Sequence, residues 1–271
     1  MSGKNLKKLP IGNEDFTYII QNGGYYVDKT SYLKKVFSNI SPVILFTRPR
    51  RFGKTLLMDM FKSFLRVAPD GSANREYKEK LFAGLEILKD KEFTDKYMGQ
   101  FPVISISLKE VYGETYQQAY DKLVEIVSEL GDKFSFLLES KVISPEQKQV
   151  LLKLKNQLEL LDPKYQSLVT GALKTYSNCL YKHYSKKVII LIDEYDVPLA
   201  KASENGYQGT DKALAGVVVG CVVERFEGSK LSDEFFICLF LKFRPELRVR
   251  LYFRERVSAG CSFYVQTAAS A

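Results

Sequence analysis

The sequence has few residues that bind zinc or form disulfides. Its 271 residues include one histidine, His183, and four cysteines, Cys179, Cys221, Cys238 and Cys261, with no CxxC pair. Because zinc sites use closely spaced ligands of these types, a structural metal is not expected. Cys179 and His183 lie four positions apart on a predicted helix. That arrangement is more typical of a packed thiol beside a surface imidazole than of a catalytic pair.

Long apolar runs are also absent. The longest, Ala213 to Val223, has eleven residues, whereas a membrane-spanning helix needs about 20. Three early lysines, Lys4, Lys7 and Lys8, are not followed by an apolar segment of signal-peptide length. We therefore expect a cytoplasmic protein without a membrane partner. With 45% apolar and 13% aromatic residues, the chain can bury the core of one domain, or of one domain and a subdomain.

Positive charge is concentrated near the N-terminus. The net charge is +8, and residues 1–66 hold twelve basic and four acidic side chains, whereas residues 67–271 hold 28 of each. A bound nucleotide phosphate accounts for some of this excess, and a nucleic acid partner is an alternative for the rest. Lysines scattered over solvated helix faces are the ordinary explanation.

A phosphate-binding loop is predicted at residues 48–55. A short apolar run, Val43 to Thr47, precedes it, and a helical pattern opens at Lys54. In the common pattern G-x-x-x-x-G-K-[ST] the first glycine falls on Arg48, so the permissive residue is missing at that end. The loop residues that we expect to bind the nucleotide are Arg48, Pro49, Arg50, Arg51, Phe52, Gly53, Lys54 and Thr55. The alternative is a basic surface turn before a helix.

This strand, loop and helix order predicts specific roles. The backbone N–H groups and the positive end of the helix dipole face a bound phosphate. Lys54 brings a mobile charge to the outer phosphate oxygens, and the hydroxyl of Thr55 coordinates Mg²⁺.

A second motif follows 139 positions after the first. Val188 to Ile192 is an uninterrupted apolar run that ends in Asp193 and Glu194. Such a run is typical of a central strand in a parallel sheet, and these sheets bind ligands at their carboxyl ends. We expect Asp193 to hold Mg²⁺ and Glu194 to orient or deprotonate the attacking water, with Asp196 as a weaker candidate behind them. Alone, the two acids would more simply be a solvated loop.

Other segments complete the predicted α/β architecture. Phe101 to Leu108 alternates as a strand, and it lies along the chain between the two motifs. Helices are predicted within Glu114 to Ser140, from a Ser144 cap to about Leu160, and from Pro163 to about Lys186.

Near the N-terminus, Phe16 to Asp28 is predicted as two short strands around an Asn22-Gly23-Gly24 turn. A helix through Tyr32, Leu33, Val36 and Phe37 comes next. Asp28 and Lys29 either contact the ligand or form a solvated pair.

Three ordered motifs resemble those of the bacterial AAA-ATPase-like proteins. They are Tyr26 to Thr30, Thr47 to Leu56 and Ile192 to Leu199. Members of that family commonly carry this arginine-rich loop without its first glycine. The resemblance covers about residues 6–207 and implies an ATP-binding P-loop fold and ATPase activity. It also implies a P-loop NTPase-type parallel sheet flanked by helices, with a helical insertion at about residues 110–186 between the phosphate loop and the acidic strand. One further strand between the loop strand and the acid strand is typical of the additional-strand class of these ATPases.

Residues 208–271 form a divergent tail in this interpretation. From Glu76 to Glu224 the sequence has 19 lysines and no arginine. From Arg225 to Arg256 it has six arginines and two lysines. This change favours the hypothesis that the tail is truncated or read from a shifted frame. The nuclease-like C-terminal domain of longer family members does not fit here. Phe235 to Leu241 is apolar enough for the strand after the acid strand but lacks a polar sensor, and Arg244 is a speculative arginine finger.

The sequence thus predicts an ATP- and Mg²⁺-dependent ATPase that drives a conformational or remodelling task. Two alternatives stay open: a regulatory or interaction module that binds nucleotide without hydrolysing it, and a nucleic-acid-associated ATPase. The sequence does not specify the protein or nucleic acid partner, or the oligomeric state.

Overall fold

The computed structural model describes residues 7–38, 43–48, 52–194, 196–205, 235–242 and 263–266. The chain divides into two compact units. Unit 1 comprises Met1–Ile40 and Arg50–Val103, and unit 2 comprises Ser41–Pro49 and Ile104–Ala271. The predicted phosphate loop therefore begins in unit 2 and ends in unit 1. Within the described residues, no helix combines the length and apolar character needed to cross a membrane.

Unit 1 is built from short helices. They are α1 (Phe16–Gln21), α2 (Ser31–Phe37), α3 (Lys54–Leu65), α4 (Arg75–Leu81), the 3-10 helix η1 (Glu86–Lys89) and α5 (Lys91–Tyr97). Rings from α1, α3 and the end of α4 pack together, with ring centroids 4.9 Å apart for Phe16 and Phe82 and 5.3 Å apart for Phe64 and Phe82. Predictions of helices at α2 and α3 are confirmed.

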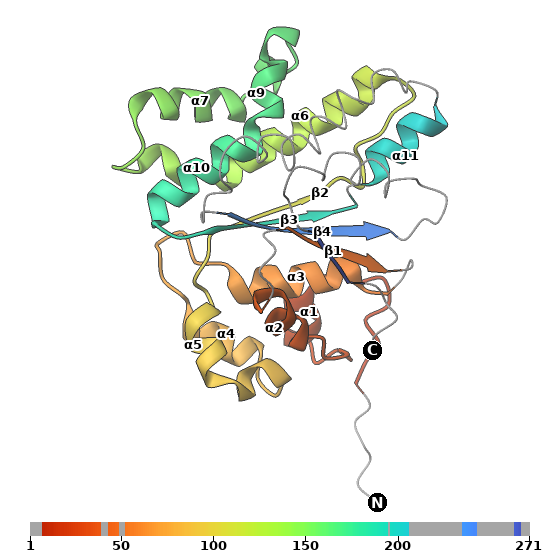
Figure 1. Ribbon diagram of the computed structural model, residues 1–271, viewed down its shortest axis with the longest axis vertical. Helices are drawn as coiled ribbons and strands as arrows, with labels where there is room; N and C mark the ends of the chain where they lie inside the picture. The colour runs from red at the N-terminus through yellow and green to blue at the C-terminus, as the bar shows by residue number, and fades with distance from the viewer. Residues whose placement is uncertain are drawn as a thin grey trace, which may run out of the picture. The chain divides into compact units, whose positions relative to one another are not determined.

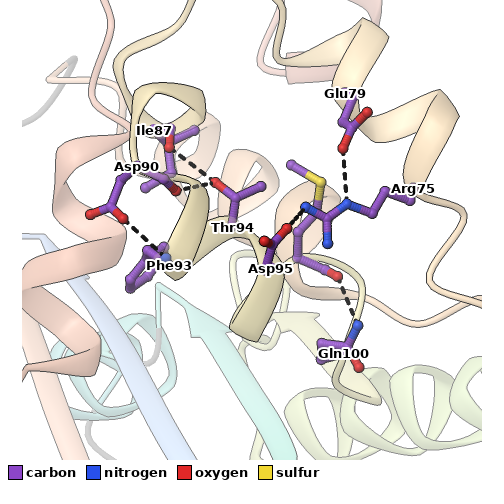
Figure 2. Close-up of polar contacts among 9 residues, drawn as sticks. Arg75, Glu79, Ile87, Asp90, Phe93, Thr94, Asp95 and Gln100 are labelled. Carbon is purple, nitrogen blue, oxygen red and sulfur yellow. Dashed lines mark hydrogen bonds and ion pairs between the residues drawn. The ribbon is translucent and has the colours of Figure 1, made fainter.

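Polar side chains tie α4, η1 and α5 together, as Figure 2 shows. The hydroxyl of Thr94, which is 3% exposed, donates to the carbonyl oxygens of Ile87 at 3.1 Å and Asp90 at 2.7 Å. Arg75 bonds Glu79 on its own helix and Asp95 on α5. These contacts connect helices of seven residues or fewer, which are too short to be stable alone.

The N-terminal prediction of two short strands is wrong, because Phe16–Gln21 is the helix α1. Asp15 caps this helix by accepting a hydrogen bond from the backbone nitrogen of Tyr18 at 2.7 Å. Phe16 and Ile19 are 0% and 1% exposed, and a spacing of three residues places them on one helical face. Burial of that face decides the helical conformation, although the aromatic and polar mixture resembles a strand. The turn after it is confirmed, with Gly23 at φ +64°.

Unit 2 holds a five-stranded sheet whose order is β2-β3-β4-β1-β5. The strands are β1 (Val43–Arg48), β2 (Val103–Ser107), β3 (Val188–Asp193), β4 (Phe235–Lys242) and β5 (Phe263–Gln266). The pairs β1–β4, β1–β5 and β3–β4 are parallel. Strands predicted at Val43 to Thr47, Phe101 to Leu108 and Val188 to Ile192 are confirmed. The interpretation of Phe101 to Leu108 as the strand interposed between the loop strand and the acid strand is wrong for the sheet: it forms β2, on the far side of β3, and the strand between β1 and β3 is β4.

Helices of unit 2 gather on one face of this sheet (Figure 1). They are α6 (Tyr116–Lys133), η2 (Ser135–Glu139), α7 (Pro145–Lys155), α8 (Gln157–Leu160), η3 (Pro163–Tyr165), α9 (Gln166–Thr170) and α10 (Ala172–Tyr184); α11 (Asp196–Glu204) follows β3. A continuous apolar cluster joins them to the sheet and includes Val124, Leu154 and Tyr176. The parallel strands with helices packed against them support the α/β class.

Two predicted helices are interrupted. The helix that Ser144 caps, with the expected capping box, ends at Lys155, and Asn156 caps α8 by accepting from the backbone nitrogen of Glu159. The segment expected as one helix from Pro163 is divided into η3, α9 and α10, with Gly171 between the last two. Asn and Gly favour such breaks because one offers a side-chain cap and the other tolerates non-helical backbone.

Candidate nucleotide site

The glycine-lysine-threonine turn lies in unit 1 at the start of α3. Gly53 is the N-cap residue and adopts the left-handed conformation, with φ +68° and ψ +41°. A residue with a Cβ atom would pay about 1–2 kcal/mol for that conformation, which explains the glycine. As a glycine, Gly53 has no side chain that could cap the helix. The first N–H groups of a helix also have no acceptors within the helix. The geometry of this helix start is therefore compatible with an anion.

Lys54 is buried, with 7% of its surface exposed. Its neighbours are more accessible: Thr55 is partly exposed, and Phe52 is 52% exposed. Lysines are rarely so buried unless a fixed partner or function holds them. Lys54 is the first residue of α3, so its side chain leaves the helix at the positive end of the helix dipole.

Lys29 contacts the same turn from the segment before α2. Its Nζ atom donates to the carbonyl oxygen of Phe52 at 2.9 Å, and a Cβ atom added to Gly53 would lie 3.3 Å from it. The sequence left two roles open for Lys29: contact with the ligand, or a solvated ion pair with Asp28. No pattern in the sequence indicates the contact, because 23 positions separate the two residues.

Asp28 takes other partners and fixes the backbone around Lys29. One carboxylate oxygen accepts from the backbone nitrogen of Thr30 at 2.8 Å and its hydroxyl at 2.7 Å. The other accepts from the backbone nitrogen of Glu86 at 2.7 Å. Thr30, which is 0% exposed, also accepts from the backbone nitrogen of Ile87. Lys29 therefore lies between two residues, Asp28 and Thr30, whose side chains both accept hydrogen bonds from backbone nitrogens of η1.

The two acids lie in unit 2 at the carboxyl end of β3. Asp193 is 1% exposed and Glu194 is 8% exposed. Glu194 has φ +54°, a conformation that costs a residue other than glycine about 1–2 kcal/mol. Strain of this kind accumulates at functional sites. Carboxylate oxygens are ligands that Mg²⁺ prefers, so two adjacent buried carboxylates are compatible with a cation.

Strand register relates the acids to the end of the loop strand. Asp193 and Phe46 of β1 are both paired with Phe240 of β4, and all three strands run parallel. Neighbouring strands lie about 4.8 Å apart, so β1 and β3 are separated by roughly 10 Å. β1 continues two residues further, to Arg48. The strand that leads into the loop and the strand that carries the acids therefore end at the same edge of the sheet.

Several predicted residues lie outside the description. Pro49, Arg50, Arg51 and Arg244 are not among the described residues, and only the backbone of Arg48 and Asp196 is described.

The cysteine and histidine interpretation concerns α10. Cys179 is fully buried, and His183 Nδ1 lies 2.8 Å from the hydroxyl of Ser140. Burial lowers the pKa of His183. In the part of the chain that the structure describes, no three His, Cys, Asp or Glu residues form a metal-binding group.

Comparison with known proteins identifies the family. The family described as "Predicted AAA-ATPase" matches residues 10–222, and the chain belongs to it. A protein of Azotobacter chroococcum mcd 1, named "Uncharacterized protein in vnfD 5'region", is 30% identical over 123 residues, which are 45% of this chain. The match spans 21% of that protein's length. No solved structure matches this chain. The motif resemblance is confirmed, and the family match extends to residue 222.

Proposed function

We propose that this chain is an ATPase that binds ATP and Mg²⁺ through residues 48–55, Asp193 and Glu194 and uses hydrolysis to drive a conformational or remodelling task. The observation that carries the proposal is the strand order: β1 and β3 run parallel to β4 and flank it. Parallel sheets bind ligands at the carboxyl ends of their strands. One strand between the loop strand and the acid strand is also typical of the additional-strand P-loop ATPases that the motifs resemble.

Covalent continuity supports a common site. Five residue steps separate Arg48 from Gly53, and an extended chain covers at most about 3.6 Å per residue. The turn that carries Lys54 is therefore joined to the end of β1 by a covalent tether of at most about 18 Å.

Each side chain has a role in this proposal. Lys54 and the N–H groups at the start of α3 bind the phosphates. Glu194 accepts the proton of the attacking water, and its strained backbone turns the chain directly after Asp193. Lys29 acts as a positioning residue, because it holds the Phe52 carbonyl and so fixes the turn before Lys54.

The residues present fit Mg²⁺. The carboxylate of Asp193 and the hydroxyl of Thr55 are hard oxygen ligands, which this ion prefers, and Mg²⁺ commonly takes one or two such ligands with the phosphates. When bound, the ion would neutralise charge on the transferred phosphoryl group.

Two substitutions test the proposal. Lys54→Ala should abolish ATP binding in isothermal titration. Glu194→Gln should keep ATP affinity but lower phosphate release by about 10²- to 10⁴-fold, the usual contribution of a general base. Equal phosphate release by Glu194→Gln and the parent would remove Glu194 from this role. Unchanged ATP affinity in Lys54→Ala would contradict the site itself.

A non-hydrolysing nucleotide-binding module is the second candidate. β4 is the strand after the acid strand, and its residues Phe235 to Leu241 include no polar side chain that could orient water. Phosphate release by the parent that does not exceed release by Lys54→Ala, together with ATP binding by the parent alone, would establish this candidate.

A further inference from the structure

Unit 1 contains a cavity that the proposed nucleotide site does not use. Its volume is about 270 Å³, and none of residues 52–55 lines it. Residues of α1, α3, α4 and the segment after α3 surround it, and its charged lining residues are Asp15, Asp59, Lys62, Arg66 and Lys78. Arg66 follows the last residue of α3, and Lys54 is the first residue of that helix. Twelve residues at about 1.5 Å each separate the two ends by about 18 Å, so one phosphate ion cannot contact both.

Lys78 is an unusual lining residue. It is 6% exposed, and the contact that its ammonium group makes is with the backbone carbonyl of Ser63. Lysines this deeply buried are ordinarily paired with a carboxylate. An ammonium group has three N–H donors, and one carbonyl oxygen uses one of them.

Both lining carboxylates are committed to other groups. Asp59 accepts from the backbone nitrogen of Phe16 at 2.9 Å and pairs with Lys62 on its own helix. Asp15 caps α1 through the backbone nitrogen of Tyr18. Lys62 is therefore compensated by Asp59 within the cavity wall. Asp15 keeps its charge, so the charged lining side chains sum to +1, and neither Lys78 nor Arg66 forms a salt bridge with a carboxylate among the described residues.

The neighbouring charge that shifts the pKa of Lys78 is that of another cation, Arg66. Burial and, secondarily, the neighbouring Arg66 guanidinium lower the pKa of Lys78 to about 8. Two cations on one cavity repel each other, and burying a charge that is not paired with an opposite charge is costly.

We propose that this cavity binds a small dianion of the phosphate type, with Arg66 and Lys78 as its two cationic donors. A tetrahedral dianion offers a separate oxygen to each of the two cations and attracts both more strongly than a monocarboxylate does. The planar fork of arginine fits two oxygens of a tetrahedral oxyanion, and lysine adds a point charge to a third. This inference does not depend on ATP binding by the loop.

Inorganic phosphate and sulfate are the probes, and acetate is the monoanion control. Isothermal titration of the parent chain should show phosphate or sulfate binding at a site that does not need the loop, and at least tenfold weaker acetate binding there. The site should persist in Lys54→Ala, which removes the phosphate-loop lysine. Lys78→Met and Arg66→Gln should each weaken binding at least tenfold. Lys80→Met is the matched control, because Lys80 lies on the same helix but pairs with Glu76 at the surface; it should bind like the parent.

Three outcomes would overturn the proposal. One is no phosphate or sulfate binding by the folded parent at millimolar concentration. Another is loss of the signal in Lys54→Ala, which would assign it to the phosphate loop. The third is equal affinity in the parent and in Arg66→Gln, which would identify an adventitious ion only. Arg66 is exposed, so this last variant remains informative if Lys78→Met does not fold.

Discussion

Both units combine apolar packing with buried polar contacts, but polar side chains link separate short helices in unit 1. In unit 1, buried polar side chains such as Thr30, Thr94 and Lys78 bond backbone groups of neighbouring segments. In unit 2, a continuous apolar cluster joins the helices to the sheet. Helix length is part of the reason. In unit 1 α1, α2, α4 and α5 have six or seven residues and α3 has 12, whereas α6 and α10 of unit 2 have 18 and 13, beside the short α8 and α9.

Short helices offer little apolar surface, and few of their hydrogen bonds lie within the helix. Directed bonds from Asp, Thr and Lys add to the packing of Phe16, Phe64 and Phe82, and they also fix individual backbone positions. The turn that presents Lys29 to the phosphate loop is fixed in this way. Unit 1 is therefore suited to positioning single groups, and unit 2 to holding a sheet edge rigid.

The largest expected effect is in the apolar cluster. Leu154 is fully buried in α7, and Leu154→Ala should lower the free energy of unfolding by about 2–5 kcal/mol through lost packing and a residual cavity. Leu152→Ala on the same helix, where Leu152 is 53% exposed, should change it by less than about 0.5 kcal/mol. Urea unfolding measures both. Similar losses in the two variants would contradict the assignment of α7 to the core.

The next effect concerns the polar contacts of unit 1. Thr30→Val keeps the side-chain shape but leaves the buried nitrogen of Ile87 without its acceptor, which should cost about 1–3 kcal/mol. Thr175→Val in α10 is the control. Its hydroxyl bonds the Gly171 carbonyl, which already accepts the backbone nitrogen of Thr175, so a change below about 0.5 kcal/mol is expected. If both variants unfold at the urea concentration of the parent, unit 1 does not depend on its polar contacts.

The smallest effect is on ligand affinity alone. Lys29→Met removes the bond to the Phe52 carbonyl and should raise the Kd for ATP about tenfold, or about 1.4 kcal/mol, with little change in unfolding. Lys29→Arg should restore part of the affinity, because it keeps a cationic donor. Isothermal titration gives both values. If Lys54→Ala loses ATP binding while Lys29→Met binds like the parent, the proposed site stands and the positioning role of Lys29 does not.

Much of the fold followed from local patterns. The apolar runs at Val43 and Val188 predicted strands, and the face of Leu57, Phe61 and Phe64 predicted α3. The Ser144 cap was also correct. These patterns involve residues within a few positions of each other. The α1 prediction failed because its conformation depends on burial against α3 and α4, which the local alternation does not reveal.

For the candidate site, the sequence identified the turn at Gly53 and the acids at the end of β3. The roles assigned to Lys54, Thr55, Asp193 and Glu194 stay predictions. The contact of Lys29 with the Phe52 carbonyl and the left-handed backbone of Glu194 could not be predicted, since both depend on what surrounds them. The shifted-frame hypothesis for the tail stays a prediction that sequencing the gene would test.

The sequence by itself determined which residue types could bind phosphate and Mg²⁺, and it determined the strand, turn and helix order around them. Periodicity and caps act over about four residues, so they can be seen in one sequence. The tertiary structure alone decided that β4 separates β1 from β3, that Asp28 is bound to η1 58 positions away, and that Arg66 and Lys78 share a cavity. These arrangements arise from pairing and packing between segments distant along the chain, whose stabilisation no local pattern records.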